Sequence, residues 1–124
     1  MKRAVLIIDD DVIVRRSLEY LLHDAGIEAI TASNGRDGMK LFRAHQPRVV
    51  VTDIIMPEQE GIETIRQIRR EAPETKIIAI SGGGRIGKSD FLRIAAMFGA
   101  DITLAKPFEP KQFIDAIRNY IKAG

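Results

Sequence analysis

Five short apolar runs alternate with segments of helical period along this chain, and this alternation narrows the possible folds to a few. The runs occupy residues 4–8, 28–32, 48–52, 76–80 and 101–105. The first, third and fourth are almost wholly apolar and β-branched, which is typical of parallel strands covered by helices on both faces. The second run is more polar, as in an edge strand. The alternation of strands and helices predicts an α/β fold. Because crossovers between parallel strands are right-handed, few topologies remain. We expect a doubly wound (βα)5 domain over residues 1–124, with five parallel strands in the order 2-1-3-4-5.

The segments between the runs carry apolar residues at helical spacing, together with residues that begin or end helices. Asp11 and Asn34 are of types that cap helix starts, and Pro110 suits the first turn of a helix. Gly26 and Pro73 are placed to end helices. A fourth helix is expected to begin with Ser89 as its cap.

Composition excludes several classes of function. The chain has 124 residues, 45% of them hydrophobic and 29% charged, as in an ordinary globular domain. The net charge is only +2 and basic residues are scattered among acidic ones, so nucleic-acid binding is not expected. The absence of cysteine excludes disulfides and thiolate metal sites. The first apolar run is too short for a membrane span and lacks the form of a signal peptide, so we expect a cytoplasmic protein without membrane contact.

Polar and charged residues follow the apolar runs where each predicted strand ends. Asp9 and Asp10 follow the first run, Asp53 the third, Ser81 the fourth and Lys106 the fifth. The carboxyl ends of parallel strands meet at one edge of a sheet, which is where open α/β sheets bind ligands. Clustered carboxylates repel one another unless a cation lies among them, which predicts a hard divalent metal. A lysine and a hydroxyl opposite that metal suit an oxyanion such as phosphate.

With Met56-Pro57 behind Asp53 and Lys106-Pro107-Phe108 after the fifth run, the ordered set resembles the receiver domain of bacterial two-component response regulators. The resemblance covers essentially the whole chain and is nearest to the single-domain, chemotaxis-type receivers. It implies a flavodoxin-like fold and a phosphoacceptor signalling domain. Such a domain is not an enzyme, although it assists its own phosphorylation and dephosphorylation.

The resemblance also implies roles for individual residues. Asp53 would be the phosphoacceptor, Lys106 would pair with the phosphoryl oxygens, and Ser81 would donate its hydroxyl to them. The expected cofactor is Mg²⁺, held by the side chains of Asp9, Asp10 and Asp53 and by the main-chain carbonyl of Ile55.

The switch and the partners follow from the same resemblance. The family often has an aromatic residue three positions before the lysine, where this chain has Thr103, so a joint rearrangement of Ser81 and Thr103 is expected instead. The phosphoryl donor would be a sensor histidine kinase or a histidine phosphotransfer protein, and the output would be contact with a downstream protein. A homodimer through the fourth helix, fifth strand and fifth helix is a further expectation.

Two alternatives remain. Gly82–Ser89 fits the phosphate-binding pattern G-x-x-x-x-G-K-[ST] between a predicted strand and a predicted helix, which would indicate nucleotide binding. That interpretation leaves Asp9, Asp10 and Lys106 unexplained. The other alternative is an interaction module that is never phosphorylated, but such a module would not need the acidic residues together with Ser81 and Lys106.

Overall fold

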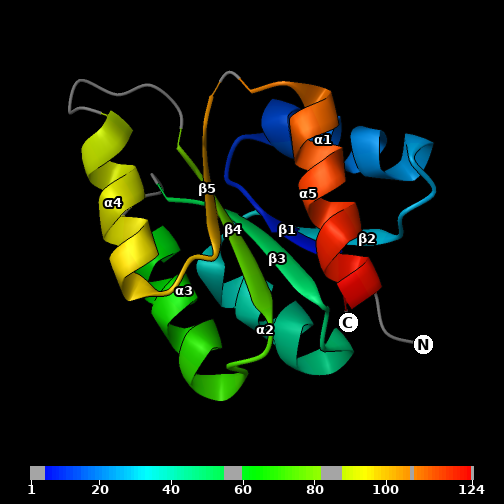
Figure 1. Cartoon of the computed structure of the whole chain (residues 1–124). Coiled ribbons are helices and arrows are strands. Elements are labelled where there is room, and N and C mark those ends of the chain that lie inside the picture. Colours follow the sequence, from blue (N-terminus) through cyan, green and yellow to red (C-terminus); the bar gives the residue numbers. More distant parts are fainter. Residues whose placement is uncertain (1–4, 55–59, 82–87, 107, 124) are drawn as a thin grey trace.

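A parallel sheet of five strands lies between two layers of helices (Figure 1). The computed structural model describes residues 5–54, 60–81, 88–106 and 108–123. The strands are β1 (Val5–Ile8), β2 (Ala29–Ala32), β3 (Val49–Asp53), β4 (Lys76–Ser81) and β5 (Ile102–Ala105). The helices are α1 (Val12–Asp24), α2 (Gly35–His45), α3 (Glu60–Glu71), α4 (Lys88–Phe98) and α5 (Pro110–Ala123). The strand order is β2-β1-β3-β4-β5, which confirms the predicted topology.

The two faces of the sheet build two separate cores, because successive side chains of a strand point to opposite sides. Helices α2, α3 and α4 cover one face, and α1 and α5 cover the other (Figure 1). Leu6 and Ile8 belong to the first core, whereas Val5 and Ile7 belong to the second. All four side chains are fully buried, which accounts for the unbroken apolar run at this position. The edge strand β2 is only half-buried over most of its length, as its polarity predicts.

Most of the predicted helix boundaries are confirmed. The Asp11 carboxylate accepts hydrogen bonds from the amides of Ile13 at 2.9 Å and Val14 at 3.3 Å, and so caps α1. Gly26 follows that helix with a φ of 77°, a conformation that glycine adopts without strain. The expectation that Ser89 caps the fourth helix is wrong, since α4 already begins at Lys88. Lysine is a good helix former, and the helix includes this residue, which precedes the expected cap.

Arg69, near the end of α3, fastens together the chain segments at the amino edge of β4 and β5. Its Nη1 group donates to the carbonyls of Pro73 at 2.7 Å and Thr75 at 2.9 Å. Its Nη2 group donates to the Gly99 carbonyl at 2.6 Å and to the Asp101 carboxylate at 2.8 Å. The same Asp101 oxygen accepts the Ile77 amide at 2.8 Å. One guanidinium therefore satisfies carbonyls on the connections before β4 and before β5.

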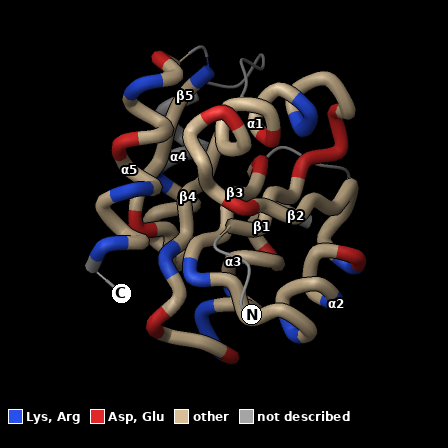
Figure 2. The backbone as a smooth tube through the Cα atoms, turned by 90° about the vertical axis from the view of Figure 1, so that its right-hand side faces the viewer, with Lys and Arg blue, Asp and Glu red and all other residues tan. Residues whose placement is uncertain are grey.

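Along the described backbone, Lys and Arg residues are interspersed with Asp and Glu residues (Figure 2). Among the described residues, none of the helices has the length and apolar character that crossing a bilayer requires.

Replacing Arg69 by methionine should lower the free energy of unfolding by about 2 kcal/mol, because the substitution removes the guanidinium donor from the part-buried carbonyls of Thr75 and Gly99 and leaves Asp101 with the Ile77 amide alone. Urea denaturation measures the change. The matched control is Arg70→Met, since Arg70 is the exposed neighbour on the same helix and should change stability by less than about 0.5 kcal/mol. Equal stability of the Arg69→Met variant and the native protein would show that the guanidinium contacts contribute nothing net.

Candidate functional site

The carboxyl edge of the sheet brings three aspartates together. Ile8 pairs with Thr52 between the neighbouring strands β1 and β3, so Asp9 and Asp53, one residue further along each chain, lie side by side. Asp10 follows at the surface. One carboxylate oxygen from each of the three residues lies within 4.8 Å of the others. The strand register thus produces the acidic cluster that the sequence predicts at this edge.

Lys106 adds a positive charge to this cluster from the neighbouring part of the sheet. Its Nζ atom lies 3.4 Å from Oδ2 of Asp53 and 3.6 Å from Oδ2 of Asp9. The residue directly follows β5, and its amide donates a hydrogen bond to the Ser81 carbonyl at 2.8 Å. The ammonium group is therefore positioned by the pairing of β4 and β5. One lysine partly balances the three carboxylates.

Asp9 is the most deeply buried of the three carboxylates. Its side chain is 1% exposed. Oδ1 accepts the Asp11 amide at 2.9 Å, but Oδ2 accepts no hydrogen bond from the described part of the chain. Burial raises the pKa of Asp9, and the neighbouring charges of Asp53 and Asp10 raise it further, although the Asp11 amide and Lys106 act in the opposite direction. A buried carboxylate oxygen without a donor, beside two more carboxylates, is the arrangement that a bound cation would relieve.

The donor set fits a hard divalent cation. Asp9, Asp10 and Asp53 offer only oxygen atoms, which suit Mg²⁺ or Ca²⁺ rather than a softer transition metal. The exposed Asp10 leaves one side of the cluster open to water, and Mg²⁺ usually retains several waters. The expected fourth ligand, the main-chain carbonyl of Ile55, lies outside the described residues.

Ser81 and Thr103 lie on the face of the sheet opposite to the side chain of Asp53. Ser81 ends β4 and is fully buried, and Thr103 on β5 is half-buried. Ala79 pairs with Thr103, and it belongs to the core beneath α2, α3 and α4. Strand alternation therefore puts Thr103 and Ser81 on that same face, next to each other along the diagonal. The geometry groups the two predicted switch residues, whereas Asp53 follows the opposite alternation.

Three further residues support the site without a clear signal in the sequence. Gly61 lies where α3 begins, and a Cβ there would overlap the Asp53 carbonyl oxygen and lie 2.7 Å from Cα of Ile54. The position thus requires glycine for α3 to pack against the end of β3. Arg15 donates from Nη1 to the Asp9 carbonyl at 2.8 Å, and Thr52 donates its hydroxyl to the Asp53 carbonyl at 3.2 Å. Of these three supporting residues, only Gly61 had a hint in the sequence, because it is a glycine at a helix start.

Comparison with known proteins identifies the family. The family model of the response regulator receiver domain matches residues 5–118. This chain is a response regulator receiver domain. Receivers of this family are signalling domains of two-component systems, and they interact with kinases or phosphotransfer proteins and with effector domains. The sequence-based identification and the flavodoxin-like fold are both confirmed.

The similar proteins include stand-alone receivers and longer regulators. The chain is 34% identical over 123 residues to the chemotaxis protein CheY of Thermotoga maritima, covering 98% of this chain and 100% of that protein. It is 35% identical over 122 residues to the probable transcriptional regulator ycf27 of Porphyra purpurea, covering 98% of this chain but 48% of the relative. The receiver thus spans about half the length of the ycf27 relatives. A receiver domain structure from Clostridium thermocellum superimposes with a TM-score of 0.88 at 30% identity, covering 98% of this chain and 95% of that one.

The receiver family also covers the glycine-rich segment. Gly82–Ser89 falls inside the matched residues 5–118, so the alternative of a nucleotide-binding loop gains no support. Residues 82–87 lie outside the described residues, and Lys88 and Ser89 belong to α4.

Replacing Asp9 by asparagine should stabilise the protein at pH 7 in the absence of divalent cations. Burial raises the pKa of Asp9 above its ordinary value of 3.8, so the carboxyl group favours folding while it is protonated. That advantage is complete below the unfolded-state pKa and is lost as the pH rises through the higher pKa of the folded state. The amide avoids the cost of the buried charge, and the melting temperature should rise by about 4 °C.

Thermal denaturation in EDTA at a series of pH values tests this sign. The gain from Asp9→Asn should shrink as the pH falls from 7 toward 4. The control Asp115→Asn removes an exposed carboxylate paired with Lys111 at 3.0 Å, and it should leave the melting temperature nearly unchanged. A destabilised Asp9→Asn variant at pH 7 would refute the claim that the ionised carboxylate is costly.

Proposed function

We propose that Asp53 accepts a phosphoryl group from a phosphohistidine of a sensor histidine kinase or a histidine phosphotransfer protein. The observation that carries this proposal is the position of the Asp53 carboxylate, which is 7% exposed and lies at the sheet edge between two acidic residues and an ammonium group at 3.4 Å. A nucleophile for an anionic substrate needs positive charge around it. The Asp53 carboxylate has the Lys106 ammonium on one side, and on the other it lies beside Asp9 and Asp10, with which it could hold a cation.

The proposed chemistry is a single transfer. A carboxylate oxygen of Asp53 attacks phosphorus, and the bond from phosphorus to the imidazole nitrogen breaks as the new P–O bond forms. The electron pair of the broken bond stays on the imidazole, which leaves as a neutral group when its other nitrogen carries a proton. Lys106 lies within reach of the phosphoryl oxygens and offsets their charge. Mg²⁺, held by Asp9, Asp10, Asp53 and the main-chain carbonyl of Ile55, would supply further neutralisation of those oxygens.

The proposed output begins at Ser81 and Thr103. The Ser81 hydroxyl donates to the new phosphoryl group, and the half-buried Thr103 adjusts on the same face of the sheet. That face is covered in part by α4, on which Ile94, Met97 and Phe98 are exposed. The apolar surface of α4, with β5 and α5, is the proposed contact for a downstream protein or for a second copy of the chain.

The remaining expectations belong to the same proposal. We take residues 1–124 as one receiver domain that is a phosphoacceptor and not an enzyme, and that acts in the cytoplasm through protein contacts. The support is the match of residues 5–118 to the receiver family and the full-length match to a chemotaxis receiver. The chain spans about half the length of the ycf27 relatives, and a role in transcription is not part of the proposal.

Incubation with acetyl phosphate and Mg²⁺ should add one phosphoryl group to the native protein, detected by intact-protein mass spectrometry. Asp53→Ala should abolish the addition because it removes the attacking oxygen, and EDTA should reduce it at least about tenfold in rate because the phosphoryl charge is then less well offset. Asp115→Ala removes an exposed carboxylate from the first half of α5 and serves as the matched control.

Beryllofluoride gives an independent measurement of the same site. Amide resonances of the native protein should shift on addition of beryllofluoride with Mg²⁺, and those of Asp53→Ala should not. Modification that persists in Asp53→Ala would contradict the proposal. ATP binding that needs Lys88 but not Asp53 would instead favour the nucleotide-binding alternative.

A further inference from the structure

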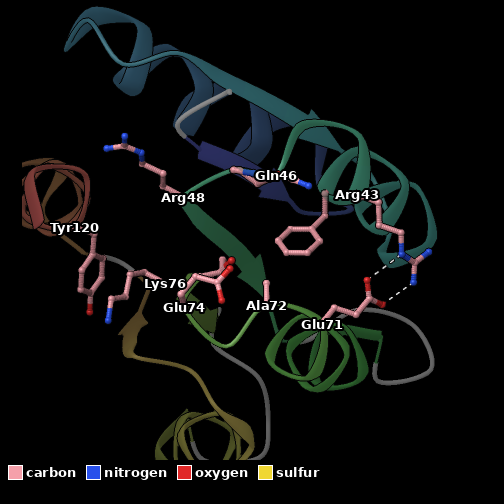
Figure 3. A pocket seen from close by; sticks show the side chains of 11 residues that line it. Arg43, Gln46, Arg48, Glu71, Ala72, Glu74, Lys76 and Tyr120 are labelled. Carbon is pink, nitrogen blue, oxygen red and sulfur yellow. Dashed lines mark hydrogen bonds and ion pairs between the residues drawn. The ribbon is translucent and has the colours of Figure 1, made fainter. Parts of the chain in front are cut away.

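A cavity of about 750 Å³ lies at the amino edge of the sheet, far along the strands from the aspartate cluster. Its walls come from the end of α2 and the connection that follows it, the end of α3 and the connection that follows it, the first residue of β4, and α5 (Figure 3). The volume falls in the range of small-molecule sites. Lys76 lines the cavity at the first residue of β4, whereas Ser81 ends the same strand near the phosphoacceptor. The cavity is thus separate from the proposed phosphorylation site.

Part of the lining is apolar and well fixed. Phe42 is 5% exposed and Pro47 is buried, and the half-buried Ala72 lies on the α3 side. The Phe42 carbonyl accepts the Gln46 amide at 2.8 Å, so the turn at the end of α2 is closed by the backbone. These contacts define a surface onto which a flat apolar group could pack.

One end of the cavity carries positive charge. Figure 3 shows Arg48, Lys76 and Tyr120 at the same end, away from Arg43 and Glu71. Arg48 uses one N–H on the Ile121 carbonyl at 3.0 Å, and the Lys76 ammonium lies 5.7 Å from the centre of the Tyr120 ring. Among the described residues, neither cation forms an ion pair with a carboxylate.

At the other end of the cavity, two lining residues of opposite charge form an ion pair. Arg43 and Glu71 form a bidentate pair, with Nε–Oε1 at 3.0 Å and Nη2–Oε2 at 2.7 Å. The hydrogen bond to Arg43 lowers the pKa of Glu71, so the pair stays charged on both sides and cancels. Glu74 is the remaining acidic residue of the lining, and it is exposed to water. The surplus charge of the lining is therefore positive and is concentrated at Arg48 and Lys76.

We propose that this cavity binds a small organic anion with a flat apolar body, such as an aromatic carboxylate. The carboxylate would lie beside the Lys76 ammonium and accept a hydrogen bond from the Tyr120 hydroxyl. The apolar body would pack on Phe42 and Ala72. The proposal depends on a cavity at the edge opposite to Asp53 and does not rest on the proposed phosphoryl transfer.

Titration of ¹⁵N-labelled protein with 2-naphthoate, followed by amide chemical shifts, tests the proposal. Saturable shifts are expected at Ala72, Thr75 and Lys76, with the same dissociation constant in Asp53→Ala as in the native protein. Lys76→Gln should weaken binding about tenfold, because it removes a charged contact to the carboxylate. Lys122→Gln makes the same change in net charge at an exposed α5 position outside the cavity, and it should leave the affinity unchanged.

Two further variants and two further probes separate the contributions of charge and of shape. Glu74→Gln should tighten binding of 2-naphthoate, since it removes the opposing charge. Ala72→Phe should abolish binding because the larger side chain fills the cavity, and the amide shifts elsewhere in this variant should remain native. Acetate and 2-naphthalenemethanol, which lack the ring and the charge respectively, should each bind at least about tenfold more weakly. Absence of saturable shifts, equal affinity for the neutral alcohol, or equal losses in Lys76→Gln and Lys122→Gln would overturn the proposal.

Discussion

The repulsion among three carboxylates at one edge of the sheet is the constraint around which this domain is organised. The register of β1 and β3 leaves no alternative to bringing Asp9 and Asp53 together, and burial of Asp9 increases the cost. The single positive charge of Lys106 does not balance the three carboxylates. Its Nζ atom lies 3.4 Å from Oδ2 of Asp53 and 3.6 Å from Oδ2 of Asp9, and Asp10 lies beside both acids. A fold optimised for stability alone would avoid this arrangement. A cation bound among the three carboxylates could relieve this cost.

The sequence predicted the fold well because two independent patterns agree. Apolar runs such as Val49–Val51 can only be satisfied between two helical layers, and residues such as Asp11 and Gly26 mark where the helices start and stop. The candidate site followed from the fold, because parallel strands put their ends at one edge. Asp9, Asp53 and Lys106 needed only the right strand order to meet.

Other parts of the structure could not be predicted, because they depend on distances between segments far apart in the chain. Nothing local marks Arg69 as the donor to Gly99 and Asp101, thirty residues or more away. The requirement for glycine at position 61 comes from the approach of α3 to the end of β3. The same is true of the cavity beside Tyr120, whose lining comes from α2, α3, β4, α5 and two of the connections between these elements. The start of α4 was misplaced by two residues, since a cap at Ser89 would put the first helical residue at 90 and the helix begins at Lys88.

The alternation of side chains along the strands has a consequence for how the two halves of the molecule communicate. The core under α1 and α5 and the core under α2, α3 and α4 are separated by the backbone of the sheet, so side chains of one do not pack on those of the other. Asp53 and Ser81 end neighbouring strands and follow opposite alternation, so this edge is a place where both cores reach the same small volume. A group added at this edge would therefore lie next to side chains from both faces of the sheet.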